Sequence, residues 1–368
     1  MARRRTHRES DSIIAGITAR VIMLVVACLL LLSYISLAVN PAKAWYMTAL
    51  GLLYMPLVLA NGFLLVWAIE RMSKSFMIPL LALLPSLIFI GHYVQFKSGA
   101  EEPSEHPVKI VSYNVGLFKQ GRKSEFKGLA GSKACLDSVK KFIRETDADI
   151  VCLQEVSLSG KYDVASFLKE SFPGYNSSYF MFVTDEGSYG NVTLSRYPVT
   201  GKGKIDFDHS SNLAIYTDIK IGDEDLRVYN CHLQSYNISL SGLVKNFGRD
   251  SSLVKNTEEK MKRSIRTRPR QVEMIAEDIE ECPSQVVVAG DFNDNPMSYS
   301  YFRLMKGEQD TFVEAGKGFG ATYSLLWPLI RIDYILVPDR YGCVSHRIPK
   351  LKYSDHYPVV AEFNVKGE

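Results

Sequence analysis

The sequence predicts an α/β or α+β domain built of packed layers, preceded by three membrane-spanning helices. Roughly the first 100 of the 368 residues are far more apolar than the rest, which marks the main boundary in the chain. Beyond it, continuous apolar runs of strand length alternate with helical and hairpin patterns, which is typical of sheets buried on both faces. We therefore expect a membrane region over 1–98, a linker over 99–107 and one large domain over 108–368.

Three apolar segments, at about 13–39, 46–69 and 76–96, are each long enough to cross a bilayer, which takes roughly 20 helical residues. Aromatic side chains lie near their ends, where interfacial residues belong. A cleaved signal peptide is the alternative for the first segment. Its apolar run is too long, a small-residue cleavage site is lacking, and two more spans follow, so we expect an integral membrane protein.

Basic residues flank these segments unevenly. Four arginines precede the first span, and Arg71 and Lys74 lie between the second and third, whereas the first loop offers only Lys43. The positive-inside rule then puts the N-terminus in the cytoplasm and the large domain outside it, in the periplasm if the membrane is a bacterial inner membrane. If the third segment were only interfacial, the domain would face the cytoplasm. The lipid bilayer is the expected partner of this region, and no protein partner is predicted.

Charge and cysteine content exclude some classes. Basic and acidic side chains number 43 and 40, giving a net charge of +3, which is too even to predict nucleic-acid binding from composition. None of the six cysteines has the spacing of a zinc site, and no disulfide framework is expected. A basic insertion over 235–270 is either a solvated helix face or a rim that attracts a polyanion or anionic lipid.

Within the large domain, strands and helices are expected to alternate. Apolar runs of strand length lie at 108–115, 148–153, 190–195, 285–289, 331–337 and 359–365. Residues 213–221 and 226–233 form a predicted hairpin around the turn Gly222-Asp223-Glu224. Helical patterns occupy 132–146 and 270–280, and a loop and helix occupy 157–172.

Polar clusters lie at the ends of several of these strand-like runs. They are Leu153-Gln154-Glu155, Gly290-Asp291-Phe292-Asn293, Arg331-Ile332-Asp333-Tyr334 and Ser354-Asp355-His356-Tyr357-Pro358. Carboxylate and amide oxygens suit a hard divalent cation, and an Asp–His pair suits proton transfer at neutral pH. Taken singly, Glu155 is as readily a helix cap and Asn114 a turn residue.

The last three clusters carry more specific expectations. Asp291 and Asn293 straddle Phe292, so in extended backbone both side chains point the same way and can orient one water. Asp333 lies in a buried run and carries a desolvation cost unless it is paired, for which His356 is the expected partner. His232, at the end of 226–233, either donates to a phosphate oxygen or is a strand-end histidine with local bonds.

Three further motifs belong with these clusters in order along the chain. They are Ser112-Tyr113-Asn114-Val115, Gly190-Asn191-Val192-Thr193-Leu194-Ser195-Arg196-Tyr197-Pro198 and Asn230-Cys231-His232-Leu233. The set resembles the deoxyribonuclease I-like endonuclease/exonuclease/phosphatase superfamily and covers essentially all of the large domain. The resemblance implies a four-layer sandwich, in which two packed mixed β-sheets are flanked by helices and the site lies at the top between the sheets.

The resemblance also implies a role for each residue. Glu155 is expected to be the principal Mg²⁺ ligand, assisted by Asn114 and Asp355, with Mn²⁺ as the alternative ion. Asp291 and Asn293 match the pair that positions the attacking water, and His356 backed by Asp333 matches the histidine that handles protons or stabilises the transition state. His232 matches a second phosphate-contacting histidine, and Asn191 lies in a motif that faces the phosphate.

Three functions remain open at this point. The first is a membrane-anchored phosphodiesterase or phosphatase that acts on a lipid head group or a small phosphoester by in-line attack of water on phosphorus. The second is an extracytoplasmic nuclease that cleaves DNA or RNA, and the third is a catalytically silent binding module. Leu325, Leu326, Trp327 and Leu329 are expected either to form an apolar lip beside the site, which would suit a lipid, or to pack under a loop.

Overall fold

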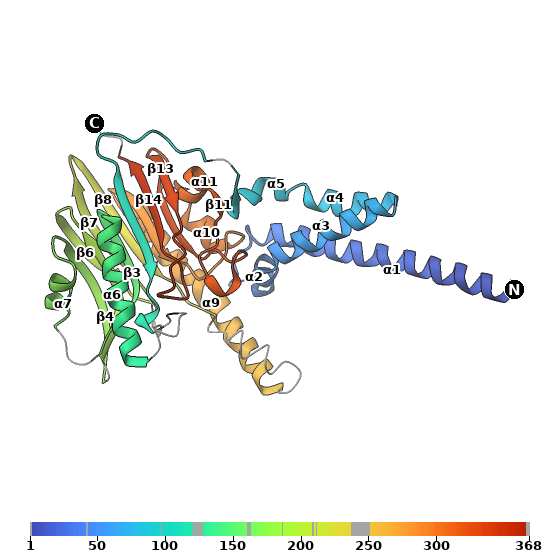
Figure 1. The fold of residues 1–368 in the computed structure, drawn as a ribbon, viewed down its shortest axis with the longest axis horizontal. Coiled ribbons are helices and arrows are strands. Elements are labelled where there is room, and N and C mark those ends of the chain that lie inside the picture. Colours follow the sequence, from blue (N-terminus) through green and yellow to red (C-terminus); the bar gives the residue numbers. More distant parts are fainter. Residues whose placement is uncertain are drawn as a thin grey trace. The chain divides into compact units, whose positions relative to one another are not determined.

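The computed structural model describes residues 2–365 apart from 42, 97, 120, 122–127, 160–162, 186, 208–209, 211 and 237–250. Residues 237–250 of the basic insertion expected at 235–270 therefore lie outside the described residues. The chain divides into two compact units, Met1–Gly91 with Met297–Tyr299, and His92–Pro296 with Ser300–Glu368. The elements are drawn and labelled in Figure 1.

The first unit consists of apolar helices. Two of them, Gly16–Ile35 and Lys74–His92, are long and apolar enough to cross a membrane, and the pair Trp45–Leu52 and Tyr54–Glu70 counts as a third span if its 54° bend is accommodated. Asn61, a buried polar residue of this unit, donates through Nδ2 to the carbonyls of Leu57 and Val26 at 2.9 and 3.3 Å. The helices are α1 (Ala2–Ile35), α2 (Trp45–Leu52), α3 (Tyr54–Glu70), α4 (Met77–Leu83) and α5 (Ser86–Phe89), with 3-10 turns at Lys74–Phe76 and Ile90–His92.

The second unit contains two six-stranded mixed sheets. One has the strand order β10-β12-β9-β8-β7-β6 and the other β13-β14-β2-β3-β5-β4. In each, a parallel pair lies near the centre, β8 with β9 and β2 with β3, and antiparallel strands surround it. A small ladder joins β1 to β11. The strands are β1 (Val94–Gln95), β2 (Val108–Asn114), β3 (Ile150–Ser159), β4 (Asn176–Thr184), β5 (Gly187–Ser195), β6 (Val199–Ile205), β7 (Leu213–Ile221), β8 (Glu224–His232), β9 (Gln285–Asp291), β10 (Glu308–Asp310), β11 (Gly318–Phe319), β12 (Asp333–Pro338), β13 (Gly342–Arg347) and β14 (Val359–Asn364).

Helices cover the outer faces of both sheets. One core cluster joins α6 and α7 to strands β2, β3 and β5 through residues such as Val139 and Leu168, and a second lies between the two sheets, where Ile150 and Val287 are completely buried. On the far side, Asp278 of α9 contacts Arg227 of β8, and the ring of Tyr301 in α10 packs 5.0 Å from that of Tyr334 in β12. The helices are α6 (Gly128–Thr146), α7 (Val164–Ser171), α9 (Ser251–Glu281), α10 (Tyr299–Leu304) and α11 (Thr311–Ala315), with 3-10 turns at Gly116–Phe118 and Ser324–Leu326.

This arrangement confirms the four-layer sandwich expected from the sequence. The segment expected as a linker is hydrogen-bonded along the second unit, since the amides of Gly99 and Glu101 donate to the carbonyls of Glu314 and Cys343, both at 2.8 Å. The third apolar segment ends as a helix at His92 rather than continuing to Phe96, because Val94–Gln95 pairs with β11 instead.

Candidate active site

Strand pairing alone brings most of the expected side chains to one end of the sandwich. Asp291 at the end of β9 is the register partner of His232 in β8 on one side and of Asp333 in β12 on the other. On the facing sheet, Asn114 ends β2 beside Gln154 of β3. The polar clusters at the ends of separate strands thus meet because the strand ends meet.

Two of these residues have left-handed backbone. Glu155 (φ 53°) and Asn293 (φ 52°) are non-glycine residues with positive φ, a conformation that is costly and concentrates at functional sites. Glu155 lies where the β3–β5 register shifts between Leu153 and Val156, and such a bulge turns a side chain away from the regular alternation. Gly290 is required for a different reason, since a Cβ on it would lie 2.0 Å from the carbonyl oxygen of Cys231.

Asp291 is the centre of the cluster and is completely buried. Its Oδ2 accepts hydrogen bonds from Nδ2 of Asn114 at 3.0 Å and of Asn293 at 3.1 Å, and its Oδ1 accepts one from the Asn293 amide at 2.8 Å. Nε2 of His356 and Nε2 of His232 lie 3.8 and 3.9 Å from Oδ2. Burial raises the pKa of Asp291, and the nearby His356 offsets only part of that rise.

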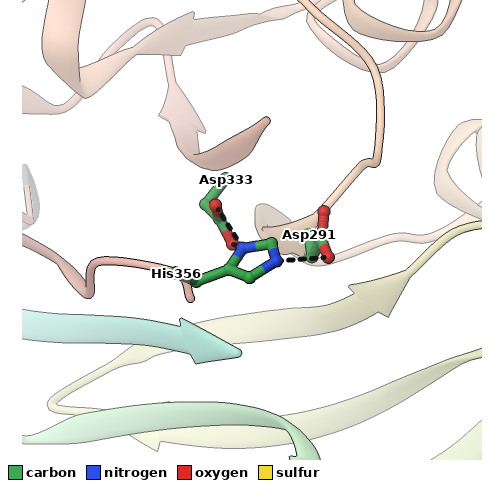
Figure 2. A group of neighbouring side chains, drawn as sticks. All are labelled: Asp291, Asp333 and His356. Atoms are coloured by element: carbon green, nitrogen blue, oxygen red, sulfur yellow. Dashed lines mark hydrogen bonds and ion pairs between the residues drawn. The ribbon is translucent and has the colours of Figure 1, made fainter. Parts of the chain in front are cut away.

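His356 lies between two carboxylates, as Figure 2 shows. Its Nδ1 is 2.9 and 3.1 Å from the two oxygens of Asp333, while its Nε2 faces Asp291. Burial by itself would lower the pKa of His356, but the charges of Asp333 and Asp291 outweigh it and raise the pKa well above the usual value. The imidazole is therefore held in one orientation with Nδ1 engaged and Nε2 directed at Asp291.

Glu155 and Asp355 lie beside Asp291 and His356. Oε1 of Glu155 is 3.3 Å from Nδ2 of Asn114 and 3.4 Å from Nε2 of His232. Burial raises the pKa of Asp355, His356 lowers it and the charge of Glu155 raises it further. Within the described part of the chain, no lysine or arginine forms an ion pair with Glu155, Asp291, Asp333 or Asp355.

This surplus of carboxylates is the chemistry expected of a divalent-cation site. Asp291, Asp333 and His356 offer three potential ligand atoms within 4.8 Å of one another. The Asp333–His356 bond and the raised pKa of His356 favour a proton on that imidazole, however, and a ligating histidine must be neutral. Glu155 and Asp355 retain oxygens suited to Mg²⁺ or Mn²⁺.

Two expected residues are engaged differently. Oδ1 of Asn114 accepts a hydrogen bond from the Gly116 amide at 3.0 Å, so it is the amide nitrogen that faces the carboxylates. Asn191 is completely buried between the sheets, and its Nδ2 donates to the carbonyls of Asn230 and Leu213 at 3.1 and 3.4 Å. The phosphate contact expected for Asn191 stays a prediction.

Sequence reasoning missed the residues that hold the cluster in place. Arg268, part of the basic insertion, is buried; it pairs with Asp294 at 3.0 Å and donates through Nε and Nη2 to the carbonyl of Gln234 at 2.9 and 2.6 Å. It thereby ties the segment after His232 to the segment after Asn293. Arg263, Arg266 and Arg270 in the same stretch are basic and exposed, so nothing in the charge pattern distinguished Arg268.

The loop before β12 is a second missed support. Oγ1 of Thr322 accepts hydrogen bonds from the amides of Ile332 and Asp333, both at 3.1 Å. The ring of Tyr323 packs at 5.3 Å from that of His356. A hydroxyl in a loop has no sequence signal that separates it from an ordinary turn residue.

Comparisons with known proteins agree with this geometry. The model of the Endonuclease/Exonuclease/phosphatase family matches residues 111–356, and a model described as a domain of unknown function (DUF8431) matches residues 16–93. The chain belongs to the endonuclease/exonuclease/phosphatase family, whose members are generally phosphoester hydrolases.

Individual relatives are more distant. The uncharacterized protein YbhP of Escherichia coli strain K12 is 27% identical over 253 residues, which cover 62% of this chain and 88% of that protein, and YbhP of Shigella flexneri matches equally. An endonuclease/exonuclease/phosphatase structure from Beutenbergia cavernae aligns with a TM-score of 0.52 at 17% identity, over 72% of each chain. One from Bacteroides vulgatus aligns with a TM-score of 0.51 at 18% identity, over 71% of this chain and 100% of that one. These two structures establish the fold alone.

Proposed function

We propose that this protein is a membrane-anchored, divalent-metal-dependent phosphoester hydrolase in which water attacks phosphorus in line with the leaving oxygen. The observation that carries the proposal is the environment of Asp291, a buried carboxylate held by two amides and facing two imidazoles at 3.8 and 3.9 Å. Such a set contains a base for water and hydrogen-bond donors for a phosphoryl group.

Asp291 is the proposed base. Its raised pKa, caused first by burial, makes it a better proton acceptor near neutral pH than an exposed aspartate. The amides of Asn114 and Asn293 occupy defined positions on its oxygens and so fix the direction from which a water can donate. Asn293 is itself anchored by its bond to the carbonyl of Leu233 at 2.9 Å.

The two histidines are the proposed phosphate-binding groups. His356, kept protonated by Asp333, presents Nε2–H toward the same space that Asp291 faces and would stabilise negative charge on a phosphoryl oxygen. His232 approaches from the neighbouring strand with Nε2 between Glu155 and Asp291. Because both rings are placed by strand ends, little reorganisation is needed on substrate binding.

Glu155 and Asp355 are the proposed holders of the cation, with Mg²⁺ expected and Mn²⁺ as the alternative. When bound, the ion offsets charge on the phosphate and leaving oxygens. Burial raises the pKa of Asp355 and the charge of Glu155 adds to that rise, while no lysine or arginine in the described part of the chain pairs with either carboxylate, which fits such an ion. Asn114 then contributes by orienting Asp291 and Glu155 through its amide nitrogen.

A direct assay tests the proposal. The full-length protein, purified in detergent, should hydrolyse bis-p-nitrophenyl phosphate in the presence of Mg²⁺, and EDTA should stop the reaction. Asp291→Asn should lower turnover by two orders of magnitude or more, whereas Asp206→Asn, at an exposed carboxylate paired with Lys204, should not change it. Equal activity with and without EDTA would contradict the metal dependence.

A nuclease is the second candidate, and one surface favours it. Lys260, Arg263, Arg266 and Arg270 are exposed on α9 at spacings of three, three and four residues, which places them on one helix face. Such a basic face attracts a polyanion. A substrate panel of plasmid DNA, RNA, phospholipid and sugar phosphates separates the two candidates, since only a nuclease would prefer the nucleic acids.

We also propose that the catalytic domain faces away from the cytoplasm. The proposal rests on the basic flanks of the apolar segments and on an odd number of crossings, which requires the bent pair α2–α3 to count as one span. Alkaline phosphatase fused after Gly99 should be active, because the proposal places the fusion point outside the cytoplasm. An inactive fusion would place the domain in the cytoplasm.

A further inference from the structure

Four large apolar side chains lie exposed on β11 and on the loop between β11 and β12. Phe319, Leu325, Leu326 and Trp327 are between 37% and 64% exposed, and we call these four residues the apolar lip. The rings of Phe319 and Trp327 pack edge to face at 5.7 Å, so the two ends of the loop present one surface. Clusters of exposed apolar residues on a soluble surface mark interaction sites.

The lip is attached to the candidate active site by backbone contacts. The amide of Ser324, the residue before Leu325, donates to the carbonyl of Asp355 at 2.8 Å. The residue before it, Tyr323, forms a β-bridge with His356. Leu325, the first of three consecutive lip residues, thus follows a residue that is bonded to Asp355, one of the two proposed cation holders.

The lip is also attached to the residue at which the last candidate span ends. Phe319 is the register partner of Val94, which follows His92, the last residue of the span Lys74–His92, by two positions. Two residues of extended chain span at most about 7 Å, so Val94 lies within that distance of the end of the span. His92 is fixed on the same side, because its carbonyl accepts a hydrogen bond from Nη1 of Arg331 at 3.1 Å.

The side chain of Lys350 adds a positive charge beside the apolar lip. Nζ of Lys350 lies 3.7 Å from the centre of the Trp327 ring. Tryptophan and lysine side by side are typical of the membrane–water interface, where the ring occupies the head-group level and the ammonium meets anionic lipid.

We propose that the apolar lip enters the surface of the bilayer that holds the N-terminal helices, and that the adjacent site hydrolyses a phosphoester carried by a lipid of that bilayer. The second half of this statement rests on the proposed hydrolase function. A bilayer, rather than a protein partner, is the occupant that chain continuity supplies, since a span ends two residues before Val94 of β1, the strand that pairs with the one bearing Phe319. The phosphorus of such a lipid lies at the depth of the head groups. Lip residues inserted at the acyl boundary would hold the adjacent active site, one short loop away, near that depth.

Insertion can be measured without any catalysis. Trp45, Trp67 and Trp327 are the three tryptophans of the chain, so W45F/W67F leaves Trp327 as the single fluorophore. In nanodiscs of phosphatidylcholine and phosphatidylglycerol, lipids brominated near the glycerol should quench Trp327 strongly. The control places the fluorophore at Val183, another exposed apolar residue, on β4, as V183W with all three native tryptophans replaced by Phe. Absence of quenching at Trp327, or equal quenching at both positions, overturns the insertion.

The substrate class is tested with two reporters that share one leaving group. Water cleaves the P–O(aryl) bond of methyl p-nitrophenyl phosphate in solution and of phosphatidyl-p-nitrophenol in nanodiscs, in each case releasing p-nitrophenolate. The double variant L325D/L326D should lose at least tenfold on the lipid reporter and stay within twofold on the soluble one, and V183D should change neither. Equal loss on both reporters, or no loss on the lipid reporter, overturns the lipid assignment. If the unaltered protein cleaves neither reporter, the hydrolase proposal and the substrate class fail together, while the quenching result still decides insertion.

Discussion

Replacing Asp333 by Asn should slow the reaction without weakening the fold or substrate binding. Asp333 is buried and touches His356 through two oxygens at 2.9 and 3.1 Å, so the isosteric amide keeps the shape but loses the charge. A hydrogen bond to a charged group is worth about 1.5–3 kcal/mol. At about 1.4 kcal/mol per factor of ten, kcat should fall roughly 10- to 150-fold.

The other kinetic and thermodynamic constants should change little. Asp333 acts through His356, so it is a positioning residue, and KM should stay within about threefold. The thermal unfolding midpoint should not drop, because the substitution also removes a negative charge near Asp291, which adds to burial in raising the pKa of that carboxyl. Initial rates with bis-p-nitrophenyl phosphate at saturating Mg²⁺ give both constants, and Asp206→Asn is the matched control. Unchanged kcat, or a loss confined to KM, would refute the reasoning.

Three further predictions concern Arg268, Glu308 and Glu155. Arg268→Met should cost about 3–5 kcal/mol of unfolding free energy because it leaves Asp294 buried and unpaired, whereas the exposed control Arg263→Met should leave the unfolding midpoint unchanged. Glu308→Gln should stabilise the protein by about 1–3 kcal/mol at pH 8. Burial, then the charge of Asp339, raises the pKa of Glu308 to about 8, so the folded state retains a proton that the unfolded state loses as pH rises above the lower pKa of the unfolded chain. Denaturant titrations should show the difference in stability between the variant and the unaltered protein vanishing near pH 4. Glu155→Gln should raise the Mg²⁺ concentration for half-maximal activity about tenfold or more, and an unchanged Mg²⁺ titration would remove Glu155 from the proposed cation site.

The centre of the fold was predictable because its strands are continuous apolar runs. Strands β2, β9, β12 and β14 are buried on both faces, and burial of that kind leaves an unbroken pattern in the sequence. The edge strands were not predicted. In β6, exposed Lys202 and Lys204 alternate with half-buried Gly201 and Gly203, and β4 is exposed at both ends, so neither shows the composition of a buried strand.

The helix α9 shows a different limit. The sequence indicated a helix over 270–280, but α9 begins at Ser251 and continues through Pro269, a residue that usually ends or kinks a helix. Tertiary contacts at the same turn override that preference, since Arg268 is held by Asp294 and Gln234.

The candidate site was predictable in its composition and less so in its geometry. Residue type and position were enough to expect that Asp333 pairs with His356, and the family resemblance added Asp291. Asp291 and Asp333 meet because β9 and β12 are paired, whereas His356 comes from the segment before β14 in the other sheet. The direction of the Asn114 amide depends on the Gly116 amide that occupies its oxygen. The turned backbone at Glu155 depends on a bulge in the β3–β5 ladder. Both are set by pairing partners far apart in the sequence.

The most direct test of the central claim is the fate of oxygen during turnover. With bis-p-nitrophenyl phosphate in H₂¹⁸O and Mg²⁺, the full-length protein should place one ¹⁸O in the p-nitrophenyl phosphate product and none in p-nitrophenol, and Asp291→Asn should suppress the labelled product by two orders of magnitude or more. Label in the phenol, or undiminished labelling by the Asp291 variant, would contradict attack on phosphorus by a water that Asp291 activates.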